Sequence, residues 1–295
     1  MDADSDNRLV RLLEQEQKLF DNDYDHYYVE GESKPKNIGA PFLLKHPSSK
    51  KGALLIHGLM AAPEEVREWA ECLYSKGYSV YAPRLAGHGT SAVDLSGRRY
   101  PEWLNSVDRG YDILNSICEH VVIGGFSTGA GLALFKAIYN PEKFDAVISI
   151  SAPLQFKSLS AGFVEMLHAW NVCTQMLGLK GAGKVYARNH PDNPHINYAR
   201  CPIKGIAEVR ALMRNVYKSL PFLLIPVLIM QGDNDPKVSA GSGQKIFKRL
   251  KNANSYYKSI NYHEHGIIRG EIAREVFGRV DTFLNTVFPD IQGQI

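Results

Sequence analysis

Residues 120–134 read HVVIGGFSTGAGLAL and carry the motif GFSTG at positions 125–129. The apolar run before the motif predicts a strand buried on both faces, and residues 129–139 predict a helix. A G-x-S-x-G motif between a strand and a helix is typical of a nucleophile elbow, in which a serine sits on a sharp, strained turn. The alternative is a glycine-rich turn that happens to carry a serine. The strand–turn–helix context favours Ser127 as a nucleophile.

Short apolar runs alternate with helical patterns on both sides of this motif. Strands are expected at residues 53–57, 79–82, 121–126, 146–151, 226–231 and 256–261, and helices at 63–76, 101–118, 129–139, 240–250 and 270–287. This alternation predicts a mostly parallel sheet flanked by helices, which is an α/β fold.

The alternation is interrupted between Ser151 and Pro226, where no clear strand is visible. Residues 161–178 and 203–220 predict helices, and the Pro- and Asn-rich stretch between them predicts a loop. We interpret residues 152–225 as a helical cap inserted over the carboxyl edge of the sheet, where ligands of open α/β sheets bind.

Residues 1–41 precede the main domain, which we place at residues 42–295. Residues 8–20, RLVRLLEQEQKLF, predict an amphipathic helix, and residues 21–37 predict a connecting segment. This extension could pack on the main domain, pair with a partner, or be the end of a longer protein.

A nucleophilic serine needs a base and a group that orients the base. Beside a nucleophile elbow these follow in the chain order Ser, Asp or Glu, His, each after a later strand. The expected strand at 226–231 leads into GDNDPKV, and the strand at 256–261 leads into a segment reading HEHG. We predict Asp235 as the acid, with Asp233 as a turn residue, and His265 as the base, with His263 as the alternative.

Acyl transfer also needs hydrogen-bond donors for the oxyanion. We expect one donor to be the backbone N–H of Thr128, directly after the nucleophile, and the other to be that of Leu59, in the loop after the first buried strand. His57 is expected to stabilise this loop. The candidate residues of an apolar substrate pocket, which could equally be core residues, are Met60, Phe126, Phe163, Met166 and Trp170.

The composition excludes several other classes of protein. The net charge is only +3 and no run of five Lys or Arg occurs, which argues against a nucleic-acid-binding protein. The four cysteines form no C-x-x-C pair and have no histidine at zinc spacing, so we expect no metal site. No signal peptide is recognisable, and the longest apolar run, 220–230, is too short to cross a bilayer. We therefore expect a cytoplasmic protein without an integral membrane segment; its oligomeric state is left open.

Three stretches together carry a family resemblance: LLIHGLMAAPEEVREWAECLYSKGYSVYAPRLAGHGTS, PEWLNSVDRGYDIL and VVIGGFSTGAGLAL. They resemble bacterial carboxylesterases and monoacylglycerol lipases of the α/β-hydrolase superfamily, and the resemblance runs from about residue 42 to the C-terminus. It implies an α/β-hydrolase fold with a cap, a triad of Ser127, Asp235 and His265, oxyanion donors at Leu59 and Thr128, and ester or acylglycerol hydrolysis without a cofactor. The segment YHEHGII departs from the single histidine usual in these families, and residues 1–41 have no counterpart in them.

The sequence thus predicts a serine hydrolase that cleaves a small-molecule ester, either a short- to medium-chain acyl ester or a monoacylglycerol, through an acyl-enzyme intermediate. One alternative is a thioesterase or another acyl hydrolase with the same triad. The other is a non-catalytic hydrolase-fold protein that binds a ligand or a partner.

Overall fold

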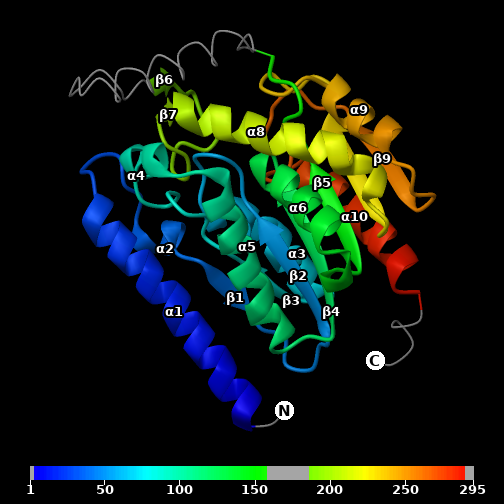
Figure 1. Cartoon of the computed structure of the whole chain (residues 1–295), viewed down its shortest axis with the longest axis horizontal. Helices are drawn as coiled ribbons and strands as arrows, with labels where there is room; N and C mark the ends of the chain where they lie inside the picture. The colour runs from blue at the N-terminus through cyan, green and yellow to red at the C-terminus, as the bar shows by residue number, and fades with distance from the viewer. Residues whose placement is uncertain (1–2, 158–185, 290–295) are drawn as a thin grey trace.

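A seven-stranded sheet lies at the centre of the computed structural model, which describes residues 3–157 and 186–289 (Figure 1). Its strands are β1 (Phe42–Leu44), β2 (Lys51–Ile56), β3 (Ser79–Ala82), β4 (His120–Phe126), β5 (Ala146–Ile150), β8 (Val227–Gly232) and β9 (Ser255–Ile260). They follow the order β1-β3-β2-β4-β5-β8-β9. Every neighbouring pair is parallel except β1 with β3, which confirms the expected mostly parallel sheet.

Helices cover both faces of this sheet (Figure 1). The α-helices are α1 (Ala3–Tyr27), α2 (Lys36–Gly39), α3 (Arg67–Ser75), α4 (Ala92–Gly97), α5 (Tyr100–Asn115), α6 (Thr128–Tyr139), α8 (Ile203–Ser219), α9 (Gly241–Arg249) and α10 (Ala273–Val287). Short 3₁₀ turns are η1 (Pro63–Val66), η2 (Pro141–Lys143) and η3 (Leu220–Phe222). Helices α5 and α6 pack on one face, and α3 and α10 contribute to the core on the other.

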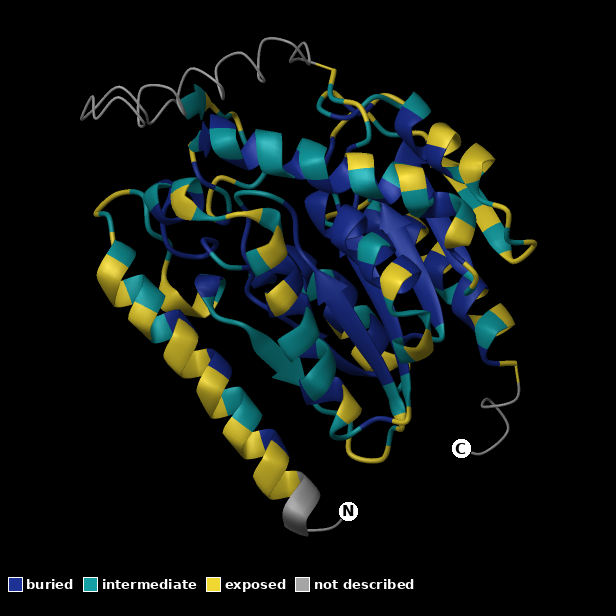
Figure 2. Cartoon of the chain, viewed as in Figure 1, coloured by how far each residue is buried: buried dark blue, intermediate teal, exposed yellow. Residues whose placement is uncertain are grey.

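Two large apolar clusters, one on each face of the sheet, form the core. Successive side chains of a strand point to opposite faces, so Leu54 and Ile56 of β2 join one cluster while Ala53 and Leu55 join the other. Figure 2 shows the central strands as buried along most of their length. Burial on both faces explains why these strands read as continuous apolar runs.

Most of the N-terminal extension forms one long helix, α1, which packs along the main domain (Figure 1). Leu9 and Phe20 on its inner face are buried. The helix runs to Tyr27, so the expectation of a connecting segment from residue 21 is wrong for its first seven residues. The aspartates there suggested a turn, but Asp23 forms an ion pair with the buried Arg84 at 2.6 Å, and this tertiary contact holds the helix in place.

The insertion after β5 contains a small hairpin that the sequence did not predict. Strands β6 (Tyr186–Arg188) and β7 (Arg200–Pro202) pair antiparallel where only a loop was expected. Three-residue strands are too short to produce a recognisable period. Helix α8 occupies the segment expected to be helical, and Figure 1 shows it with the hairpin above the upper end of the sheet. The other expected helix, at 161–178, lies outside the described residues.

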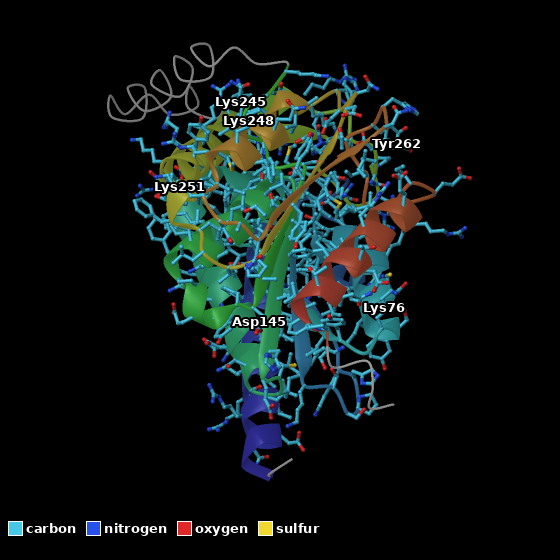
Figure 3. All side chains as sticks on the ribbon, turned by 90° about the vertical axis from the view of Figure 1, so that its right-hand side faces the viewer. Lys76, Asp145, Lys245, Lys248, Lys251 and Tyr262 are labelled. Carbon is cyan, nitrogen blue, oxygen red and sulfur yellow. The ribbon has the colours of Figure 1, made fainter. Side chains whose placement is uncertain are left out.

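Figure 3 distinguishes the two ends of the sheet. Asp145, directly before β5, lies near the lower, amino-terminal end, where its carboxylate accepts the backbone N–H of Val121 at 2.8 Å. Tyr262, shortly after β9, lies near the upper end, where the strands finish. Lys76 ties α3 to α10 through an ion pair with Asp281 at 2.9 Å.

Of the helices in the described ranges, none has the length and apolar character needed to cross a membrane.

Candidate active site

Ser127 occupies the turn between β4 and α6, with a φ of 53°. Positive φ is strained for a residue with a side chain, and the surrounding packing must enforce it. Gly129 makes the turn possible, because a Cβ at this position would overlap the carbonyl oxygens of Ile56 and His57. The strand and the helix therefore meet at van der Waals distance and raise Ser127 at the carboxyl edge of the sheet.

Three side chains from different segments form a hydrogen-bonded chain at this turn. Nε2 of His265 lies 3.0 Å from Oγ of Ser127, and Nδ1 of His265 lies 2.7 Å from Oδ2 of Asp235. Asp235 is fully buried and His265 is nearly so. With a proton on Nδ1, the imidazole donates to the carboxylate and presents a lone pair to the serine hydroxyl, which is the arrangement that activates a nucleophile.

The environment of Asp235 keeps its carboxylate ionised. Burial is the largest single effect and disfavours the charge, but the hydrogen bond from His265 opposes it. Oδ1 also accepts the backbone N–H groups of Lys237 at 2.8 Å and Val238 at 2.9 Å. Together these bonds outweigh burial and hold the pKa of Asp235 below its ordinary value. An ionised Asp235 can therefore orient His265 over the neutral pH range.

The structure distinguishes the two acids and the two histidines that the sequence left as alternatives. Asp233 is exposed and accepts a hydrogen bond from the hydroxyl of Ser259. His263 is exposed, and its ring packs beside Tyr262. Neither side chain reaches Ser127, whereas Asp235 and His265 are connected to it by hydrogen bonds.

The two expected oxyanion donors flank the serine. Thr128 begins α6 directly after Ser127, and both Thr128 and Leu59 line the same cavity as the serine. Within residues 3–157 and 186–289, no backbone or side-chain acceptor takes up the N–H of Thr128 or that of Leu59. Both N–H groups are thus available to a substrate oxygen.

His57 supports the loop that carries Leu59, as expected. Its Nδ1 lies 2.9 Å from the carbonyl oxygen of Gly58, and its Nε2 accepts the backbone N–H of Leu85 at 3.3 Å. Burial lowers the pKa of His57 to about 4, and only the hydrogen bond to Gly58 works notably against this effect. The ring is therefore neutral near pH 7 and bridges two backbone segments.

A cavity of about 330 Å³ opens in front of Ser127, between the elbow and the cap hairpin. Met60 and Phe126 line it as expected, whereas Phe163, Met166 and Trp170 lie outside the described residues. One wall is apolar, because Leu59 and Met60 pack against a small cluster of cap residues that contains Cys201 and Ile206.

The rest of this cavity is polar, which the expectation of an apolar pocket missed. The polar residues that line it include Glu65, Asn189, His190, Asp192, Asn193, Asn197 and Lys237. Most belong to the Pro- and Asn-rich loop between β6 and β7, which lies in the predicted cap, but the sequence does not indicate that its polar side chains line the cavity. Glu65 lies in the segment PEEV directly after the loop of Leu59, and this proximity was the one available signal.

The described residues contain no group of three or more His, Cys, Asp or Glu side chains arranged to bind a metal ion. The candidate catalytic groups in this part of the chain are Ser127, its hydrogen-bonded partners His265 and Asp235, and the adjacent backbone N–H groups.

Comparisons with known proteins agree with this architecture. The family described as serine aminopeptidase, S33, matches residues 47–272. A thermostable monoacylglycerol lipase of Bacillus sp. (strain H-257) is 27% identical over 226 residues, which cover 74% of this chain and 87% of the lipase. A carboxylesterase of Bacillus subtilis (strain 168) is 22% identical over 237 residues, covering 77% of this chain and 87% of the esterase.

A solved structure from work on two metagenome-derived lipolytic enzymes, LipS and LipT, superposes with a TM-score of 0.75 at 20% identity. The superposition covers 86% of this chain and all of the other one. The α/β-hydrolase fold expected from the sequence is thereby confirmed.

Proposed function

This chain belongs to the serine aminopeptidase, S33, family, and we propose that it is a serine hydrolase that cleaves carboxylic esters at Ser127. The observation that carries this proposal is the pair of hydrogen bonds that joins Ser127 to His265 at 3.0 Å and His265 to Asp235 at 2.7 Å. An ester-hydrolysing enzyme of the lipase and esterase type also agrees with the two bacterial relatives.

The first half of the reaction forms an acyl-enzyme. The hydroxyl of Ser127 attacks the ester carbonyl carbon while Nε2 of His265 accepts the hydroxyl proton. Asp235 stabilises the resulting imidazolium, and the N–H groups of Leu59 and Thr128 stabilise the oxyanion. The tetrahedral intermediate collapses, the C–O bond to the alcohol breaks, and the alcohol leaves with the proton from His265.

The second half of the reaction releases the acid. Water attacks the acyl carbonyl while His265 accepts one of its protons, and the same two N–H groups hold the second oxyanion. Collapse breaks the bond to Oγ of Ser127, which regains its proton from His265. The products are a carboxylic acid and an alcohol, and one water molecule is consumed.

The cavity supports an amphiphilic ester as substrate. Its apolar wall, formed by Leu59, Met60 and Ile206, suits an acyl chain, and its polar wall, which includes Asp192 and Asn193, suits an alcohol that carries hydroxyl groups. Monoacylglycerols and short- to medium-chain acyl esters combine these two properties. We therefore propose them as the substrate class.

Matched substrates would test this proposal. An oxygen ester, a thioester and an amide with the same acyl chain are offered to wild-type protein and to Ser127→Ala. We expect hydrolysis of the oxygen ester with the highest kcat/KM, and a loss of about 10⁴-fold or more in the variant. Faster hydrolysis of the thioester or the amide would show that the enzyme prefers that class of substrate to oxygen esters. Folded wild-type protein that cleaves none of the three would favour a binding role instead.

A further inference from the structure

Glu65 is a buried carboxyl group beside the nucleophile that the proposed chemistry does not use. It lies in η1, its side chain lines the cavity, and only 6% of the residue is exposed. Oε2 accepts the backbone N–H of Gly58 at 2.6 Å. This donor–acceptor distance lies just below the short end of the usual range for N–H···O hydrogen bonds, about 2.7–3.2 Å. The carboxylate is thus firmly attached to the backbone of the loop that carries Leu59.

Gly58 lies between this carboxylate and the serine. A Cβ placed on Gly58 would lie 3.1 Å from Oε2 of Glu65 and 3.3 Å from Cβ of Ser127. Gly58 therefore packs closely against both Glu65 and the residue that carries the reacting hydroxyl. Glycine is also the residue with the greatest backbone freedom, so the position of this segment depends on what holds its two peptide groups.

Both peptide groups of Gly58 are held by hydrogen bonds. Its N–H is held by Glu65, and its carbonyl oxygen accepts from Nδ1 of His57 at 2.9 Å and from the N–H of Ala61 at 3.4 Å. In a planar trans peptide the N–H and the C=O point in opposite directions. The bonds to the carbonyl therefore set the direction of the Leu59 N–H, and the bond that the Gly58 N–H donates to Glu65 fixes the preceding peptide against rotation about the glycine.

We propose that Glu65 is a positioning residue that holds the N–H of Gly58, fixes the peptide group before this glycine, and thereby helps to keep the N–H of Leu59 aimed at the oxyanion. This inference rests on the proposed ester hydrolysis at Ser127. Glu65 acts through the backbone of Gly58 and does not itself touch the substrate carbonyl.

The acceptor geometry of Glu65 matters in this role, rather than its negative charge. Burial raises the pKa of Glu65, while the Gly58 N–H, the charge of His265, the side chain of Asn197 and the charge of Lys237 oppose the rise. A negative charge near a developing oxyanion gives no electrostatic benefit. Glutamine, whose amide oxygen can occupy the place of Oε2, should therefore preserve the function, and an apolar side chain of the same length should not.

The test compares Glu65→Gln with Glu65→Met, and Glu64→Met serves as the matched control because Glu64 pairs with Arg67. For Glu65→Met we expect kcat for ester hydrolysis to fall about 10- to 100-fold, with KM within about threefold of the wild-type value. The reason is that the oxyanion, which the Leu59 N–H stabilises, forms only in the transition state. Affinity for a trifluoromethyl ketone, which forms a tetrahedral adduct with serine, should fall in parallel. Glu65→Gln should recover most of kcat, and Glu64→Met should resemble the wild type.

Three results would overturn the inference: an unimpaired Glu65→Met, a Glu65→Gln as slow as Glu65→Met, or a loss confined to KM. If Glu65→Met does not fold, Glu65→Asp carries the same test, because a side chain one methylene shorter cannot reach Gly58 and should show the same loss of kcat. Wild-type ester hydrolysis with an unimpaired variant would remove only the role of Glu65. Wild-type protein without ester hydrolysis would remove the proposed function and this role together.

Discussion

In the wild type, His57 should make the free energy of unfolding fall as the pH is lowered. Replacing His57 by asparagine should remove much of this fall. His57 is fully buried and bridges the carbonyl of Gly58 and the N–H of Leu85. Burial lowers the pKa of His57 from 6.5 to about 4. In the unfolded chain the same imidazole titrates near its ordinary value.

The sign of the effect follows from these two pKa values. As the pH falls below 6.5, the unfolded chain takes up a proton that folded His57 refuses, so the stability from His57 is complete above pH 6.5 and declines toward pH 4. One pKa unit corresponds to about 1.4 kcal/mol, so the whole shift is about 3.5 kcal/mol, of which about 2.5 kcal/mol is lost by pH 4.5.

Urea unfolding midpoints of wild type and His57→Asn at pH 7.5 and 4.5 measure this difference. Asparagine keeps an N–H that can donate to Gly58 but leaves the Leu85 N–H without an acceptor, which lowers stability at pH 7.5 by about 1–3 kcal/mol. The drop in unfolding free energy between the two pH values should then be smaller in the variant by about 2.5 kcal/mol. The exposed His263→Asn is the control and should keep the wild-type drop. Equal drops in His57→Asn and wild type would refute a neutral, buried His57.

Three further substitutions test other parts of the molecule. Asp235→Asn should lower kcat by about 10⁴-fold while the protein stays folded, because His265 loses the partner that fixes its tautomer; steady-state rates near wild type would contradict this. Asp23→Asn should lower the unfolding free energy by about 2 kcal/mol, because the buried Arg84 loses an ion pair, and an unchanged urea midpoint would show that α1 is not anchored there. Gly129→Ala should abolish ester hydrolysis, because its Cβ would overlap backbone oxygens behind the elbow, and an active, stable variant would exclude this close packing.

The sheet could be predicted from the sequence because burial on both faces leaves a direct signature. Strand β3 begins and ends at the residues expected from the pattern, Ser79 and Ala82, and β4 differs by one residue at its start. The residues after strands β4, β8 and β9 could be assigned to one edge of the sheet, because parallel strands end on the same side. The candidates Ser127, Asp235 and His265 followed from that topology.

Features that depend on contacts distant in the sequence could not be predicted. The choice between His263 and His265 depends on the direction of side chains two residues apart in a loop, which no periodic pattern records. The end of α1 depends on the ion pair of Asp23 with Arg84, about sixty residues further along the chain. Nothing in the sequence distinguishes Glu65 from its neighbour Glu64, and only the fold places the carboxylate of Glu65 against Gly58.

Covalent labelling by a fluorophosphonate tests most directly whether Ser127 is an activated nucleophile. The reagent is added to folded wild-type protein, and the adduct is located by peptide mass spectrometry. We predict one adduct per chain, on Ser127, and none on folded Ser127→Ala. An adduct on a different residue, or folded wild-type protein that does not react, would contradict the assignment of Ser127 as the nucleophile.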